Sequence, residues 1–162
     1  MRTLLLALRS AIYMTGFVLI FGWIALQVRS FDRPLGVSLA DEVEALGVIL
    51  MAAGAILVLA CASVFISRGR GTPAIFDAPR AFVATGPYQY VRNPMYVGGM
   101  MLLIGFGLCE RSVSILFMAL VLFVLIHLFV VFYEEPTLTR KFGTSYQEYR
   151  QSVRRWFPRR KR

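Results

Sequence analysis

Two adjacent carboxylates follow the last apolar stretch of the chain. Glu134 and Glu135 come directly after an uncharged run that ends at Tyr133. If this run is a helix, they lie at its C-terminus, where the helix dipole disfavours negative charge by some tenths of a kcal/mol each. Solvent together with pairing to Arg140 or Lys141 is one way to compensate them, and a bound cation is the other.

A second group of polar residues comes before the third apolar stretch. Asn93 followed by Pro94 is typical of a helix start, because Asn is a favoured N-cap and Pro suits the first helical position. Arg92 then lies beside unpaired backbone N–H groups, a place that favours an anion such as a carboxylate. Tyr96 follows on a similar face. Helix initiation alone explains the Asn-Pro pair, and an anion site is the functional interpretation.

The single histidine, His127, lies inside the last apolar stretch. Seven residues, nearly two helical turns, separate it from Glu134, so both are expected on one face with His127 about 10 Å deeper. An ionisable residue in a membrane helix is a functional candidate, and a neutral histidine bonded to a neighbouring helix is the structural alternative. Cys61 and Cys109 stand in or beside apolar runs and are expected to be buried hydrophobic residues, so we expect no metal site.

The composition indicates a membrane protein. Of the 162 residues, 57% are hydrophobic and 17% are charged, with a mean hydropathy of +0.63, whereas soluble domains are about 45–50% apolar and about 25% charged. Since about 20 apolar residues cross a bilayer, we expect a single all-α membrane domain with a tight hairpin between the last two helices. The expected transmembrane helices are 10–28, 45–66, 94–109 and 112–133, with a connection 67–93 and a tail 134–162.

The distribution of basic residues predicts the orientation. The net charge is +9, and fifteen of the eighteen Lys and Arg residues lie at the N-terminus, in the connection 67–93 and in the tail. Cytoplasmic loops are the ones enriched in these residues. Both termini are therefore expected in the cytoplasm, and the bacterial inner membrane is the expected location.

The tail is predicted to form a short amphipathic helix before Pro158. Ser145 and Glu148 have capping-box spacing, and Tyr146 and Tyr149 would share one face at the membrane interface. The segment 154–162 is basic and contains two aromatic residues. Beside a membrane helix, such a segment is attracted to anionic lipid by about 1 kcal/mol per basic residue. We therefore expect anionic lipid as its partner rather than nucleic acid.

These blocks together resemble the isoprenylcysteine carboxyl methyltransferase family and its relatives, the phospholipid N-methyltransferases. The matching segments are Gly-Pro-Tyr at 86–88, Val-Arg-Asn-Pro-Met-Tyr at 91–96, Glu-Glu at 134–135 and 142–149, within a resemblance that runs from 69 to 158. Such enzymes use S-adenosyl-L-methionine at the cytoplasmic end of the last two helices, and a lipophilic acceptor enters from the membrane. The resemblance implies the following cofactor contacts: Arg80, Ala81, Phe82, Val83, Tyr88, Asn93, Pro94, Met95, Tyr96 and Glu135. From their own chemistry, Arg92 as an anion-binding group and Glu134 as a proton acceptor are the expected catalytic residues.

Two departures from the family bear on the acceptor. Asn93 stands where the family commonly has His, and Asn carries no titratable proton, so no acid–base role is assigned to it. Val131 stands where the carboxyl methyltransferases have an Arg for the acceptor carboxylate. The alternatives are therefore a prenylcysteine-like acceptor, a phospholipid amine whose proton Glu134 takes, and a non-catalytic membrane scaffold. The oligomeric state stays open.

Overall fold

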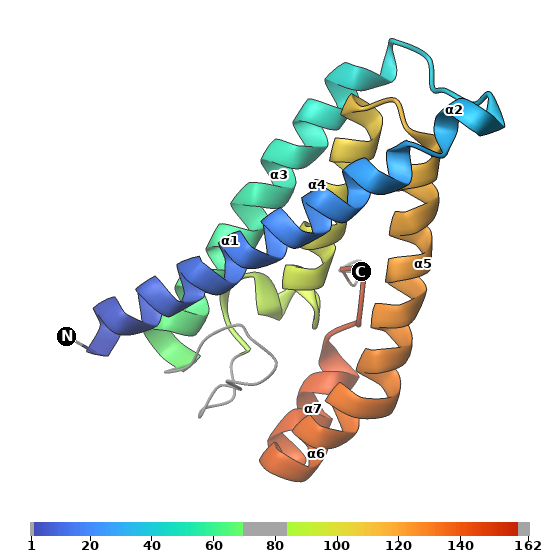
Figure 1. Ribbon diagram of the computed structural model, residues 1–162. Helices are drawn as coiled ribbons and strands as arrows, with labels where there is room; N and C mark the ends of the chain where they lie inside the picture. The colour runs from blue at the N-terminus through green and yellow to red at the C-terminus, as the bar shows by residue number, and fades with distance from the viewer. Residues whose placement is uncertain (1, 70–83, 159–162) are drawn as a thin grey trace.

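The computed structural model describes residues 2–69 and 84–158, and every regular element among them is helical. Figure 1 shows α1 crossing the bundle obliquely, with α4 between α3 and α5. Three helices are long and apolar enough to cross a membrane, at Ala7–Leu35, Val43–Ser67 and Val113–Phe142, and Pro94–Cys109 is a shorter apolar helix. The predicted all-α class is confirmed. The elements are α1 (Arg2–Arg29), α2 (Asp32–Leu35), α3 (Val43–Val64), η1 (Phe65–Gly69), η2 (Gly86–Gln89), α4 (Pro94–Cys109), α5 (Val113–Phe129), η3 (Val130–Glu134), α6 (Glu135–Phe142) and α7 (Thr144–Ser152).

Glycines allow α3 and α4 to pack with their backbones in contact. A Cβ added at Gly54 would lie 2.8 Å from the carbonyl oxygen of Gly98, and one added at Gly105 would lie 2.7 Å from that of Gly47. Each helix thus contributes two glycines seven residues apart, on the face that meets its partner. Small residues of this kind are what membrane helices use for close approach. The close packing of this pair fixes the position of α4 against α3.

The predicted hairpin between α4 and α5 is confirmed. Ser112 is the N-cap of α5, and its hydroxyl accepts a hydrogen bond from the backbone N–H of Ile115. Asp32 reaches the same helix end and accepts a hydrogen bond from the N–H of Ser114 at 2.9 Å. Arg29 at the end of α1 pairs with Glu110 at 2.6 Å. The turn between α4 and α5 is therefore also the attachment point of α1 and α2.

The last apolar helix does not end where the sequence predicted. Its residues pass from α5 through a π-helical turn, η3, directly into α6, which ends at Phe142 rather than near 133. Pro136 explains the π-helical turn, because it has no N–H and its ring would collide with a carbonyl one α-turn earlier. The wider turn changes the angle between His127 and Glu134. These two side chains contact different parts of the chain, since Glu134 bonds to Tyr96 and His127 bonds to Trp156.

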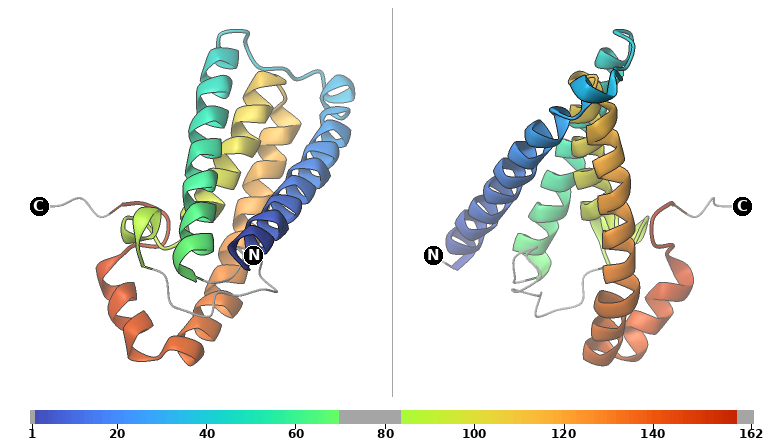
Figure 2. Two further views of the ribbon diagram at one scale, coloured as in Figure 1. Left: turned by 90° about the vertical axis from the view of Figure 1, so that its left-hand side faces the viewer. Right: turned by 45° about the vertical axis from the view of Figure 1, so that its right-hand side comes forward.

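The segment after α7 turns back onto the bundle. After α7, Val91 and Arg154 form a short parallel bridge, and the N–H of Arg92 donates to the carbonyl of Arg154 at 2.9 Å. Both views in Figure 2 place this returning segment on the side of the bundle away from α1. Large apolar side chains such as Ile20, Leu59 and Phe117 are exposed along the long helices, as expected where the surroundings are hydrocarbon.

Candidate functional site

A small pocket lies where η2, the start of α4, the junction of η3 with α6, and α7 meet. Its volume is about 100 Å³. It brings together five of the residues that the sequence predicted for the site, although they come from two segments about 40 positions apart. The lining residues are Phe65, Tyr88, Arg92, Asn93, Glu134, Glu135, Leu138, Phe142, Tyr146 and Tyr149.

Glu135 is the centre of a charged cluster in this pocket. It is only 4% exposed, and its carboxylate is contacted by three guanidinium groups. Arg92 lies at 3.0 Å, Arg150 at 3.6 Å, and Arg155 donates two hydrogen bonds, at 2.7 and 3.0 Å. These hydrogen bonds raise the pKa of Arg155 above its usual value. The carboxylate is thus compensated from the segment before α4, from α7 and from the tail, whereas the sequence had pointed to Arg140 and Lys141.

Part of the Arg92 guanidinium group has no hydrogen-bond partner among the described residues. Its side chain is 9% exposed, and only Nη2 contacts Glu135. The Nε and Nη1 atoms are buried and have no hydrogen-bond partner among the described residues, and the same holds for the hydroxyl of Thr85 nearby in sequence. A buried charged donor without a partner is costly, so these atoms favour an anionic ligand group. This observation fits the carboxylate of an amino-acid-like cofactor.

Glu134 has a very different environment from its neighbour. Its side chain is half-buried, and the hydroxyl of Tyr96 donates to its Oε2 at 3.0 Å. Within the described residues, no ion pair joins Glu134 to a basic side chain. Tyr96 does not line the pocket, but its hydrogen bond to Glu134 connects it to a residue that does. The chain therefore places one heavily compensated carboxylate directly beside one that has no cationic partner in this part of the chain.

Two tyrosines of α7 form one wall of the pocket. Tyr146 and Tyr149 are 3% and 8% exposed, and their ring centroids lie 6.1 Å apart. The predicted shared face is confirmed, and this face covers the pocket. Burial, reinforced by the charge of Glu135, raises the pKa of Tyr146 to about 12, and burial also raises the pKa of Tyr149. Both stay neutral, and the Tyr149 hydroxyl donates to the backbone carbonyl of Tyr88.

The helix termini differ from prediction in their details. Asn93 occupies the N-cap position of α4, as expected, but its side chain makes no capping bond. Its Nδ2 instead donates to the backbone carbonyl of Arg155 at 3.2 Å. Helix α7 starts after Gly143, whose φ of 57° suits glycine, and no side chain caps it. Asn93 is therefore the N-cap residue that the sequence predicted, without a side-chain capping bond. The predicted capping box that starts at Ser145 is wrong, because α7 starts before it, although both helices form.

His127 is bonded to the tail. The indole N–H of Trp156 donates to its Nδ1 at 3.0 Å, and the Trp156 ring lies 5.2 Å from that of Phe123. Trp156 is therefore held against α5. Sequence reasoning assigned Trp156 only to lipid contact and gave Arg150 and Arg155 no place in the site. Whether Arg150 and Arg155 reach Glu135 depends on how the chain turns back at α7.

The remaining predicted cofactor residues have different outcomes. Met95 packs against Cys61 and Tyr88 in a small apolar cluster behind the pocket. Pro94 is fully buried in the first turn of α4. Cys61 is buried and not in a disulfide, as expected of a small hydrophobic residue. Four predicted contacts, Arg80, Ala81, Phe82 and Val83, lie outside the described residues, and their part in the site stays a prediction.

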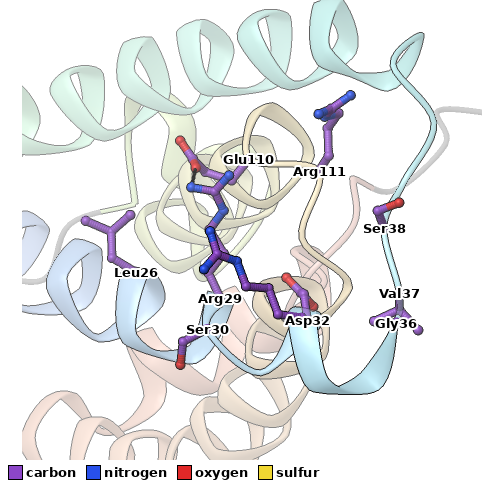
Figure 3. Close-up of a pocket in the computed structure, with 10 residues that line it drawn as sticks. Leu26, Arg29, Ser30, Asp32, Gly36, Val37, Ser38, Glu110 and Arg111 are labelled. Atoms are coloured by element: carbon purple, nitrogen blue, oxygen red, sulfur yellow. Dashed lines mark ion pairs between the residues drawn. The ribbon is translucent and has the colours of Figure 1, made fainter.

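A larger pocket of about 530 Å³ opens at the other end of the bundle (Figure 3). It is lined by α1, α2 and the turn after α4 and contains none of the predicted site residues. Its acidic residues hold helices together, since Glu110 pairs with Arg29 and Asp32 accepts the N–H of Ser114. Arg111, also on its lining, pairs with Asp41. We therefore assign the chemistry to the smaller pocket.

Comparison with known proteins gives a family match for the chain. A family model described as phospholipid methyltransferase matches residues 43–145, which is more than half of the chain. The match runs from the start of α3 into α7 and includes Arg92, Glu134 and Glu135. It begins earlier than the resemblance inferred from the motifs, and it stops before Arg155 and Trp156. A search of curated proteins finds no match.

Proposed function

Because the chain belongs to the phospholipid methyltransferase family, it is an S-adenosyl-L-methionine-dependent membrane methyltransferase acting on a membrane lipid, and we propose that its acceptor is the amine of a phospholipid headgroup. The predicted family, enzyme class and cofactor are confirmed by the match. The sequence had left the acceptor open between a carboxylate and an amine. Glu135 has basic partners and Glu134 has none among the described residues, and this difference favours the amine.

The observation that carries this proposal is the uncompensated carboxylate. Glu135 has three guanidinium partners, while Glu134 has a tyrosine hydroxyl and no basic partner among the described residues. A half-buried carboxylate of this kind attracts an ammonium group and repels a carboxylate acceptor. The carboxyl methyltransferases place an Arg at the position of Val131, and valine offers no charge to an acceptor carboxylate. An amine therefore suits this end of the pocket better.

The described residues also fit one end of the cofactor. When bound, S-adenosyl-L-methionine supplies an electrophilic methyl group on its sulfonium. Arg92 would hold the cofactor carboxylate with its free Nε and Nη1 donors, and Tyr88 and Tyr146 would shield the site from water. Small-molecule sites usually measure roughly 300–1,000 Å³, so a pocket of about 100 Å³ surrounds only part of the cofactor.

Glu134 would prepare the acceptor. A headgroup ammonium has no free electron pair at neutral pH, so it must lose a proton before it can attack a methyl group. Glu134 accepts that proton, and the Tyr96 hydroxyl holds the receiving carboxylate in place. Each methyl transfer leaves the nitrogen positively charged again. Glu134 must therefore pass one proton to water for every methyl group transferred to an amine that still carries N–H.

We place the chain in the bilayer with four crossing helices. Helix α4 has 16 residues, which span about 24 Å at 1.5 Å per residue, against a hydrocarbon core of about 30 Å. A locally thinned bilayer accommodates this difference. In this arrangement the pocket and both termini lie at the cytoplasmic surface, where the basic tail meets anionic lipid. The bacterial inner membrane stays our predicted location.

A matched pair of variants tests the role of Glu134. Purified protein in phosphatidylethanolamine vesicles is incubated with methyl-labelled cofactor, and labelled lipid is counted. Glu134→Gln should lower the rate at least 100-fold, as loss of a general base does, while its affinity for S-adenosylhomocysteine stays that of the wild type. Glu148→Gln, a change on the exposed face of α7, should behave like the wild type. Full activity of Glu134→Gln would refute the proposed base.

A further inference from the structure

The segment after α7 is built into the site by its backbone. Residues 153–158, called the C-terminal strap below, lie along the start of α4. The N–H of Arg92 donates to the carbonyl of Arg154, and both the N–H and the Nδ2 of Asn93 donate to the carbonyl of Arg155, at 3.3 and 3.2 Å. Two residues that the sequence predicted for the site therefore use polar groups to hold the strap.

The side chains of the strap reach across to the other long helix. Arg155 bonds to Glu135 at the start of α6, and Trp156 bonds to His127 inside α5. Helices α4 and α5 are joined at their hairpin, and Figure 1 shows them further apart at the end where the strap lies. Figure 2 shows this segment on the face away from α1. The strap thus ties the start of α4 to α5 and α6.

The way in which Arg155 binds Glu135 affects Arg92. Arg155 uses Nε and Nη2 to contact both carboxylate oxygens, which is the two-pronged geometry that a guanidinium prefers. Arg92 is left with a single contact to Oε1, through Nη2. Its Nε and Nη1 are consequently the buried donors without a partner. Without Arg155, the same two-pronged geometry would be open to Arg92, and its free donors would turn to Glu135.

We propose that Arg155, Trp156 and His127 are positioning residues that keep Arg92 available for the cofactor carboxylate. The Trp156–His127 hydrogen bond fixes the strap, and the strap holds Arg155 on Glu135. Arg155 then binds both carboxylate oxygens of Glu135, and the Nε and Nη1 atoms of Arg92 remain available as hydrogen-bond donors. This inference deepens the proposed function, since it concerns how the same pocket binds its cofactor, but it does not depend on which lipid is methylated.

The test compares two ligands that differ in the carboxylate. S-adenosylhomocysteine carries the amino-acid end, and 5′-methylthioadenosine lacks it. Binding is measured by calorimetry on the full chain in detergent for the wild type, Trp156→Phe, His127→Leu and Arg155→Lys. Each substitution should weaken S-adenosylhomocysteine about five- to tenfold, the scale of one lost hydrogen bond, and leave 5′-methylthioadenosine unchanged. Phe157→Leu, on an exposed strap residue, should change neither affinity.

Two results would overturn the proposal. An equal loss of affinity for both ligands would mean that the strap only maintains the fold, and unchanged affinity for both would mean that it does not influence Arg92. A fluorescence measurement supplies a readout that needs no ligand. With Trp23→Phe as background, Trp156 is the only tryptophan, and His127→Leu should shift its emission to the red as the strap loosens. Because no acceptor lipid is present, failure of the amine proposal would leave these results unaffected.

Discussion

Removing the charge of Glu135 should destabilise the end of the molecule where α6, α7 and the start of α4 meet. Glu135→Gln keeps the shape of the side chain but leaves three guanidinium groups without their carboxylate. Loss of one partner of a buried ion pair typically costs about 3–5 kcal/mol. The side chain of Arg92 is 9% exposed, but those of Arg155 and Arg150 are 26% and 43% exposed, so solvent screens the latter two. We therefore expect about 3 kcal/mol, near the lower end of that range.

The assay is thermal unfolding in detergent, followed by intrinsic fluorescence. At about 2–4 °C per kcal/mol for a chain of this size, Glu135→Gln should lower Tm by about 6–12 °C. Glu134→Gln is the matched comparison, because the same isosteric change there weakens only the bond from Tyr96. That bond loses its charged acceptor, which costs about 1 kcal/mol or about 2–4 °C. Equal shifts for the two variants would refute the contrast on which the site assignment depends.

Three further predictions concern helix packing and the cofactor. Gly54→Ala should destabilise the protein by about 1–3 kcal/mol in thermal unfolding, because the added Cβ would lie 2.8 Å from a carbonyl oxygen of the facing helix. Gly99→Ala is the control and should leave the stability unchanged, since a Cβ added there would meet nothing within 4 Å. Tyr149→Phe should cost about 1–3 kcal/mol in the same assay, because a buried carbonyl loses its donor. Arg92→Gln should weaken S-adenosylhomocysteine at least tenfold in calorimetry without affecting 5′-methylthioadenosine, and equal losses for both ligands would contradict its proposed contact with the carboxylate.

Local signals in the sequence predicted much of the helical framework. The uncharged runs gave the long helices, the Asn93-Pro94 pair gave the start of α4, and the break before Ser112 gave the hairpin, because each depends on residues close together in the chain. The π-helical turn before Pro136 was not predicted. Proline in a helical pattern is compatible with a helix end or with a continued helix, and only the packing of α6 and α7 decides between them.

The proximity of several candidate residues was predicted from the sequence, but the contacts between them were not. The motifs named Arg92, Glu134 and Glu135 as neighbours of one pocket, and the structure brings them together. The roles of Arg155 and Trp156 could not be predicted, because a basic segment with aromatic residues beside a membrane equally suits lipid contact. Their contacts depend on the turn at Gly143 and on the direction of α7, both of which are set by tertiary packing.

The identity of the methylated product tests the central claim most directly. Vesicles that contain the purified protein, phosphatidylethanolamine, a prenylcysteine and methyl-labelled cofactor are extracted, and the labelled lipid is characterised by mass spectrometry and by treatment with base. Our account predicts label on the ethanolamine nitrogen, which base does not release as methanol. Label that base releases as methanol would identify a methyl ester on the prenylcysteine and contradict the amine acceptor.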